Sequence, residues 1–133
     1  MNVMQIFLVD DDEIFKTAAE ILISANFPEF EIVHFENGLE VYNRLIEIEK
    51  TKGKLPVLML LDINMPVMNG WELLEEIKGH KGRIKSNVQI YISTSSIAPQ
   101  DMNLSKTYDF IEGYITKPLT NGDLQHIRNS LLR

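Results

Sequence analysis

The chain has 133 residues, of which 44% are hydrophobic and 24% charged, and its formal net charge at pH 7 is −6. This composition fits one globular domain with its own core, and the acidic balance argues against direct binding to DNA, which usually needs a basic face. The absence of cysteine excludes disulfides and thiolate metal sites. The sequence also shows no signal peptide and no membrane-length apolar run, and together these features predict a cytoplasmic protein that does not enter a membrane.

The first half of the chain predicts a strand, a helix, a strand and a helix. The apolar run at 5–9 predicts a short buried strand. A helix follows with Asp12 as its N-cap, and its apolar positions recur at helical spacing: Ile14, Ala18, Leu22 and Ala25. Pro28 ends this helix, residues 30–35 alternate as a second strand, and another helix begins at Gly38.

The second half predicts three more strands and three more helices. Residues 55–62 form a continuous apolar run, typical of a strand buried on both faces. A helix carrying Trp71, Leu74 and Ile77 follows, and then a basic loop at 79–87 and a strand at 88–93. The last elements are a helix with Pro99 in its first turn, a strand at 111–118, and a helix capped by Thr120 and Asp123. Five strands alternating with five helices predict a three-layer α/β domain with a parallel sheet.

Acidic and polar side chains follow the predicted strands. In such a sheet, ligands bind outside the carboxyl ends of the strands. The first strand is followed by Asp10 and Asp11, the third ends at Asp62, and the fourth and fifth bring Thr94 and Lys117 to the same edge. Each motif alone has a simpler interpretation, since an acidic run often caps a helix and a Lys-Pro pair often forms a turn. Their joint placement predicts a binding or reaction site.

The residue types at this edge indicate its chemistry. Clustered carboxylates without a nearby histidine or cysteine favour a hard divalent cation such as Mg²⁺. A carboxylate beyond the metal's needs can be a nucleophile toward a phosphoryl group, whose oxygens an ammonium and a hydroxyl would neutralise. A cation also explains why consecutive acids are tolerated beside a buried strand. Asp12 and Glu13 are predicted to interact favourably with the positive end of the next helix. The pair of Asp11 with Asp12 is an alternative to Asp10 with Asp11 as metal ligands.

Four motifs carry a resemblance to a known family. They are FLVDDDE at 7–13, LLDINMPVMNGWELLEEI at 60–77, YISTS at 91–95 and GYITKPLT at 113–120. Together they resemble the receiver domain of bacterial two-component response regulators, in its single-domain, chemotaxis-regulator-like form. The resemblance covers essentially the whole chain. It implies a flavodoxin-like (βα)5 fold with strand order 2-1-3-4-5 and helices on both faces, and one receiver domain over residues 1–133 with no output domain.

The resemblance assigns a phosphoacceptor and a metal site. Asp62 matches the aspartate that takes the phosphoryl group. Asp11 would bind Mg²⁺ directly and Asp10 through a water molecule. The carboxylate of Asp62 and the main-chain carbonyl of Asn64 would complete the protein's share of the metal coordination.

The resemblance also assigns the groups around the phosphoryl site. Thr94 and Lys117 match the catalytic hydroxyl and lysine that contact the phosphoryl group. Thr94 and Tyr114 match the two switch positions, the aromatic ring turning inward on activation, and the peptide before Pro118 is expected to be cis. Ser95 departs from the alanine or glycine usual at its position, and is expected to narrow access to the phosphoryl group.

The resemblance implies a signalling switch and not an enzyme. The only reactions it would catalyse are its own phosphorylation and its own slow dephosphorylation. Asp62 would accept a phosphoryl group, with Mg²⁺, from a phosphohistidine of a sensor histidine kinase or a histidine phosphotransfer protein. The signal would leave through a protein partner on the face of the fourth helix, fifth strand and fifth helix, or by onward phosphotransfer. The protein is expected to be a monomer or weak dimer.

Three other functions can be compared with this one. A Mg²⁺-dependent phosphohydrolase of the haloacid-dehalogenase type needs a second aspartate two residues after its nucleophile, where this chain has Asn64. A degenerate receiver acting only as a binding module would lack some active-site residues, and here all are chemically competent. A flavin-binding domain needs a phosphate-cradling loop after the first strand, where residues 10–13 would repel a phosphate.

Overall fold

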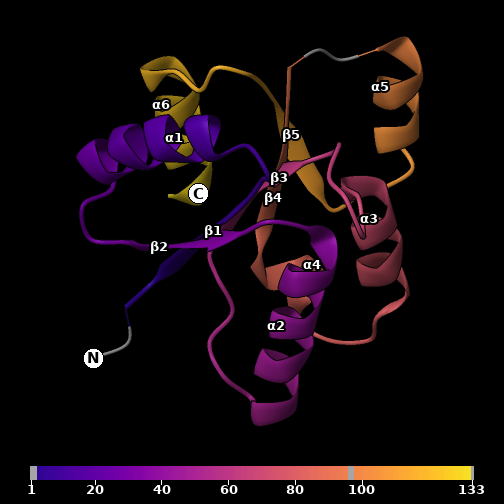
Figure 1. Ribbon diagram of the computed structural model, residues 1–133. Helices are drawn as coiled ribbons and strands as arrows, with labels where there is room; N and C mark the ends of the chain where they lie inside the picture. The colour runs from indigo at the N-terminus through magenta and orange to yellow at the C-terminus, as the bar shows by residue number, and fades with distance from the viewer. Residues whose placement is uncertain (1–2, 96–97, 133) are drawn as a thin grey trace.

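A sheet of five parallel strands forms the centre of the computed structural model, which describes residues 3–95 and 98–132 (Figure 1). The strands are β1 (Gln5–Val9), β2 (Glu31–Phe35), β3 (Leu58–Asp62), β4 (Gln89–Thr94) and β5 (Ile111–Thr116). Their order is β2-β1-β3-β4-β5, and each neighbouring pair is parallel. This confirms the predicted flavodoxin-like fold and its strand order.

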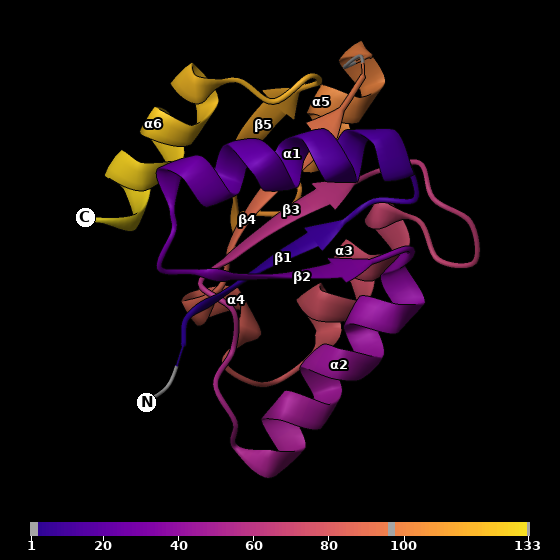
Figure 2. The ribbon, with the colours of Figure 1, turned by 60° about the vertical axis from the view of Figure 1, so that its left-hand side comes forward.

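Helices cover both faces of the sheet. In chain order they are α1 (Glu13–Asn26), α2 (Gly38–Thr51), α3 (Gly70–Gly79), α4 (Ile84–Asn87), α5 (Pro99–Ser105) and α6 (Asn121–Leu131). Figures 1 and 2 show α1 and α6 together on one face, with α2 and α3 on the other. None of the described helices is both long and apolar enough to cross a lipid bilayer.

Two hydrophobic clusters fill the space between the sheet and its helix layers. On β1, Ile6 and Leu8 belong to the cluster under α1 and α6, whereas Phe7 and Val9 belong to the opposite one. All five residues of β3 are buried, as predicted for a strand covered on both faces. Burying one of the leucine or methionine side chains of β3 stabilises the fold by roughly 1.5–3 kcal/mol. The central strands are therefore firmly held, and so are the residues at their carboxyl ends.

Helix α1 buries a different face from the one predicted. Its buried residues include Ala19 and Ile23, with Phe15 packed against the same cluster, whereas Ile14 is 83% exposed. Of the predicted face, Ala18 and Ala25 are also exposed, and Leu22 is half-buried. The sequence places apolar residues around most of this helix, so more than one stripe fits the helical period. Contact with the sheet decides which stripe is buried.

The basic segment 79–87, predicted to be a loop, contains the short helix α4. Ile84 is almost fully buried in the cluster that also holds residues of α2 and α3. The backbone N–H groups of Asn87 and Val88 donate to the carbonyls of Arg83 and Ile84, both at 3.0 Å. One apolar residue among basic ones sets up no helical period, so tertiary packing accounts for this turn.

Polar caps fix where the helices next to the strand ends begin. The Asp12 carboxylate accepts hydrogen bonds from the N–H groups of Ile14 and Phe15, which confirms it as the N-cap of α1. Thr120 and Asp123 form the predicted capping box at α6. A second capping box was not predicted: Asn69 and Glu72 form it at the start of α3. Each cap satisfies backbone donors that would otherwise lack partners.

Candidate functional site

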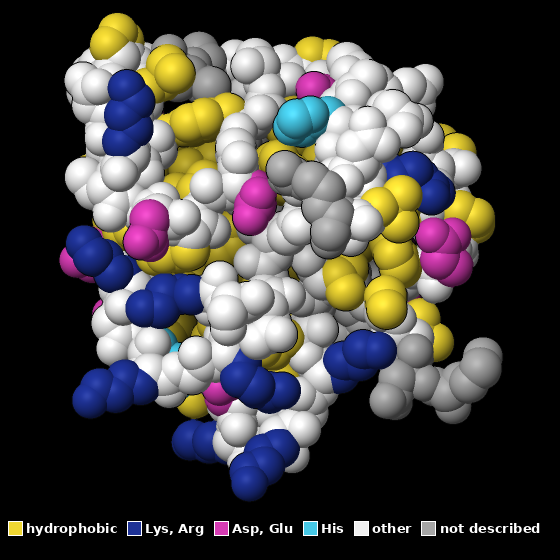
Figure 3. Space-filling view, turned by 180° about the vertical axis from the view of Figure 1, so that it is seen from behind, with side chains coloured by type: hydrophobic (Ala, Val, Ile, Leu, Met, Phe, Trp, Pro, Cys, Tyr) yellow, Lys and Arg dark blue, Asp and Glu magenta, His cyan; other side chains and the backbone are white. Residues whose placement is uncertain are grey.

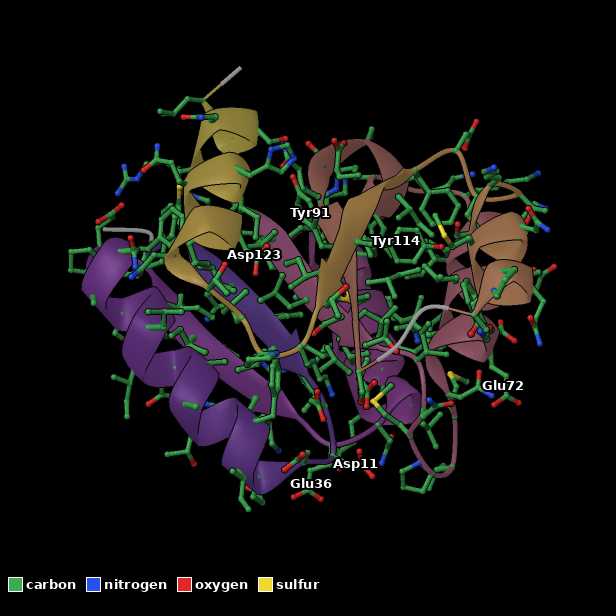
Figure 4. The ribbon with its side chains drawn as sticks, turned by 90° about the horizontal axis from the view of Figure 1, so that it is seen from above. Asp11, Glu36, Glu72, Tyr91, Tyr114 and Asp123 are labelled. Carbon is green, nitrogen blue, oxygen red and sulfur yellow. The ribbon has the colours of Figure 1, made fainter. Side chains whose placement is uncertain are left out.

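Three carboxylates meet at the carboxyl ends of β1 and β3. Asp10 and Asp11 follow β1, Asp62 is the last residue of β3, and one carboxylate oxygen from each lies within 4.8 Å of the other two. Asp10 and Asp62 are buried, whereas Asp11 is exposed at the mouth of the site (Figure 4). The alternative pair of Asp11 with Asp12 is not supported, because Asp12 caps α1 and is outside this cluster.

Lys117 brings a positive charge to the carboxylates from the end of β5. Its Nζ lies 2.7 Å from Asp10 Oδ2 and 3.6 Å from Asp62 Oδ1. The ammonium also lies 4.5 Å from the centre of the Phe15 ring, a cation–π distance. The ring and the Asp10 ion pair hold Lys117 against the cluster. Sequence reasoning missed Phe15, because nothing in its spacing distinguishes it from the other apolar residues of α1.

Two more predicted features of the site, Thr94 and the cis peptide before Pro118, lie at the ends of β4 and β5. Thr94 ends β4, is buried, and its carbonyl accepts a hydrogen bond of 2.8 Å from the N–H of Lys117. The peptide bond between Lys117 and Pro118 is cis. Ser95, the departure from the family pattern, is exposed just beyond Thr94.

The Asp62 carboxyl has a perturbed acidity. Burial, followed by the negative charge of Asp10, raises the pKa of Asp62 from 3.8 to about 6. The Lys117 ammonium and the N–H of Asn64, which donates to Asp62 Oδ1 at 3.4 Å, lower the pKa and partly offset this rise. At neutral pH the site therefore carries several close negative charges and one ammonium. An added cation would relieve the remaining repulsion.

The donor set fits a hard divalent cation. All three side chains offer carboxylate oxygens, the ligands that Mg²⁺ prefers. The buried atom Asp10 Oδ2 is close to Lys117 but has no well-aligned hydrogen bond among the described residues. A buried carboxylate oxygen in that condition is suited to a metal ion or a metal-bound water. Asn64 is exposed beside Asp62, where its carbonyl could add a fourth oxygen.

Tyr114 lies apart from the carboxylates, on the side of β5 that faces α5 (Figure 4). Its ring is half-buried against the core, and its hydroxyl donates a hydrogen bond of 3.2 Å to the carbonyl of Asp101 in α5. The residue therefore links β5 to α5. The structure thus gathers Asp10, Asp11, Asp62 and Lys117 at one point and places Tyr114 away from them, on β5 against α5.

The loop between Asp62 and α3 is tightly built. The N–H of Gly70 donates to the carbonyl of Ile63 at 2.9 Å, so the start of α3 lies directly on the end of β3. Val67 is exposed and has a φ of 67°, a strained backbone conformation for a β-branched residue. The packing of this loop fixes the backbone that carries the Asp62 carboxylate.

Replacing Gly70 with alanine is expected to lower the free energy of unfolding by about 1–3 kcal/mol. A Cβ at Gly70 would lie 2.6 Å from the carbonyl oxygen of Asp62 and 2.9 Å from the Cα of Ile63, and both are backbone atoms. Gly79→Ala, at the other end of α3, is the matched control, because nothing lies within 4 Å of its Cβ position. Urea unfolding of the two variants measures the difference, and equal stabilities would refute the steric argument.

The fold and the site together define a class of protein: a doubly wound parallel α/β domain with a carboxylate cluster and a lysine at its strand ends. The chain belongs to the response regulator receiver domain family, whose model matches residues 6–129. It is therefore a receiver domain, a class of signalling switch in two-component systems, and the resemblance in its four motifs is confirmed.

Individual relatives agree with this assignment. The chain is 32% identical over 115 residues to the chemotaxis protein CheY of Halobacterium salinarum, covering 86% of this chain and 84% of that protein. It is 27% identical over 130 residues to the two-component response regulator ORR1 of Oryza sativa subsp. japonica; the match covers 96% of this chain but only 55% of the rice protein. A crystal structure of a two-component response regulator from Cytophaga hutchinsonii matches with a TM-score of 0.87 and 30% identity, covering 99% of this chain and 98% of that one.

Proposed function

We propose that the protein accepts a phosphoryl group on Asp62 from a phosphohistidine, in a reaction that requires Mg²⁺. The observation that carries this proposal is the position of the Asp62 carboxyl: it lies in one cluster with Asp10 and Asp11, and 3.6 Å from the Lys117 ammonium. A nucleophilic oxygen close to both a cation site and a fixed ammonium meets the needs of phosphoryl transfer, which depends on positioning and charge neutralisation.

In the proposed reaction, an oxygen of the ionised Asp62 attacks the phosphorus atom. The bond between phosphorus and the donor's imidazole nitrogen breaks, the electron pair stays with that nitrogen, and the imidazole takes up a proton from solvent. With a pKa of about 6, Asp62 is mostly ionised at neutral pH. Lys117 and the Thr94 hydroxyl would contact the transferred oxygens. Mg²⁺, when bound, neutralises part of the phosphoryl charge.

The proposed metal ligands are the side chains of the cluster and one carbonyl. Asp11 and Asp62 would bind the ion directly, Asp10 would bind it through a water molecule, and Asn64 would contribute its main-chain carbonyl. The exposure of Asp11 supports its direct role, because this carboxylate is the one that a cation from solvent meets first.

The proposed output passes through α5, β5 and α6. Thr94 moves toward the phosphoryl group, and Tyr114, already bonded to the Asp101 carbonyl, couples that movement to α5. A protein partner reads the altered face, or receives the phosphoryl group in turn. The donor is a sensor histidine kinase or a histidine phosphotransfer protein, and the exchange takes place in the cytoplasm.

Intact mass spectrometry after mixing the protein with Mg²⁺ and acetyl phosphate tests this proposal. The native protein is expected to gain one phosphoryl group, whereas Asp62→Ala and a chelator-treated sample gain none. Asp109→Ala, which removes an exposed aspartate on the α5–β5 connection, is the matched control and should be labelled like the native protein. Equal labelling of Asp62→Ala would place the acceptor elsewhere, and no labelling of the native protein would contradict phosphoryl acceptance.

A further inference from the structure

Basic residues gather at the end of the molecule opposite the carboxylate site. The connection at 50–54 and the segment 78–87, here called the basic end, hold seven of the thirteen Lys and Arg residues and no Asp or Glu. The rest of the chain holds all nineteen acids and six cations. Figure 3 shows the Lys and Arg side chains collected over this lower end, next to the end of α2 and to α4. Positive charge is therefore concentrated at this end of the molecule, and negative charge predominates over the rest.

Arg83 ties the two segments of the basic end together, directly and through Glu49, which immediately precedes the first segment. Arg83 Nε lies 3.3 Å from Glu49 Oε1, and the N–H of Arg83 donates to the other oxygen of the same carboxylate at 3.2 Å. The Arg83 guanidinium also donates to the carbonyl of Gly53 at 3.0 Å. The lysines on both segments are thus carried on one joined surface.

Most positive charges of the basic end have no carboxylate partner. Across residues 3–95 and 98–132, Arg83 is the one member of the basic end with an acid within 4.0 Å. Lys85 donates to a backbone carbonyl, that of Lys78, which leaves its charge unpaired. Six like charges on one small surface repel one another and attract an anionic group from outside the molecule.

Two adjoining hollows lie at this edge of the sheet. One, of about 210 Å³, is lined by Lys54, Leu55, Val57, Arg83 and Asn87. The other, of about 260 Å³, is apolar and is lined by Met4, Phe30, Val57, Leu131 and Leu132. The two share Val57, so a cationic hollow and an apolar hollow lie side by side. This pairing suits a chain that presents a carboxylate next to an aliphatic or aromatic side chain.

We propose that the basic end binds an acidic, apolar segment of a partner protein, with a carboxylate beside the unpaired Lys54 and a neighbouring apolar side chain against Val57 and Leu132. The surface precedes β3 and β4, whereas Asp62 and Thr94 end those strands. A partner bound here leaves the carboxylate site open to a phosphodonor. The proposal does not depend on phosphoryl acceptance.

The observations favour a protein segment over nucleic acid. The segments 50–54 and 78–87 contain no Phe, Tyr or Trp on which a base could stack. The apolar hollow offers nothing to a phosphate backbone, and the acids of the remaining surface repel a long polyanion. A short acidic segment avoids these acids and fills both hollows.

A titration of the full, ¹⁵N-labelled and unphosphorylated protein tests the proposal. The probe is a short peptide in which glutamate and leucine alternate, and the comparison peptide has glutamine in place of glutamate. Amide signals of 50–57, 78–87 and 131–132 are expected to shift with the first peptide only. Lys54→Glu is expected to weaken binding about tenfold, because it exchanges an attraction for a repulsion. Lys106→Glu, the same change on an exposed lysine at the end of α5, should leave binding unchanged.

Several results would overturn the proposal. These are no shifts at the basic end, equal binding of the glutamine peptide, or equal weakening by Lys54→Glu and Lys106→Glu. Parallel titrations use vesicles containing phosphatidylserine and a short DNA duplex. If either shifts the same signals where the glutamate peptide does not, the basic end recognises phosphate on a lipid surface or on nucleic acid, and the proposed protein partner is wrong.

Discussion

Replacing Lys117 with methionine is expected to lower the free energy of unfolding by about 3 kcal/mol at neutral pH without metal. Lys117 Nζ lies 2.7 Å from Asp10 Oδ2, and the Asp10 side chain is only 1% exposed. The substitution therefore leaves a buried carboxylate without its cation. Methionine retains the length of the side chain and an apolar contact with the Phe15 ring, so the change isolates the charge. Urea unfolding in the presence of a chelator measures the loss.

Two further variants distinguish the ion pair from a general effect of the substitution. Adding Asp10→Asn to Lys117→Met is expected to restore a large part of the stability, because the unpaired buried charge is removed. Lys106→Met, on an exposed lysine, is expected to change stability by no more than about 0.5 kcal/mol. If Lys117→Met is as stable as the native protein, the Asp10 charge is compensated in some other way.

The position of the site could be predicted from the sequence because parallel strands bring their carboxyl ends to one edge. Asp10, Asp11 and Asp62 each follow or end a short apolar run, and that pattern places them at the same edge of the sheet. Their contact also requires β1 and β3 to be neighbours, as they are in the structure. The order β2-β1-β3-β4-β5 itself came only from the resemblance, since apolar runs of similar length do not specify their neighbours. The structure confirms it through the parallel pairing of each strand.

Features that depend on contacts between distant segments could not be predicted. The buried stripe of α1 is chosen by the sheet, and the turn of α4 depends on Ile84 reaching a core built by α2 and α3. The contact of Lys117 with Phe15 joins residues about one hundred positions apart, and no spacing rule relates them. The alternative metal-binding pair of Asp11 with Asp12 is disfavoured by a local feature, since the Asp12 carboxylate caps α1.

Replacing Asp62 with asparagine is expected to raise the free energy of unfolding of the metal-free protein by about 2 kcal/mol at neutral pH. Burial and the Asp10 charge raise the pKa of Asp62 from 3.8 to about 6, so the ionised form is disfavoured in the folded state. A rise of about two units corresponds to roughly 3 kcal/mol, and this net figure already includes the attraction to Lys117. Solvent at the mouth of the site, beside the exposed Asp11, screens the charge and reduces the expected gain to about 2 kcal/mol. The amide removes the charge while nearly preserving the shape of the side chain.

The pH dependence gives this prediction a definite sign. Because the folded-state pKa lies above the unfolded value, the folded protein binds the proton more tightly, and the carboxyl destabilises the fold increasingly as pH rises from about 4 to about 6. The advantage of Asp62→Asn should therefore be small near pH 4 and complete above about pH 7. Added Mg²⁺ should stabilise the native protein more than the variant, since binding the cation offsets the repulsion that asparagine lacks. If the stability gain of Asp62→Asn is equal at both pH values, ionisation of Asp62 is excluded as its cause. The gain would then come from the packing around the side chain.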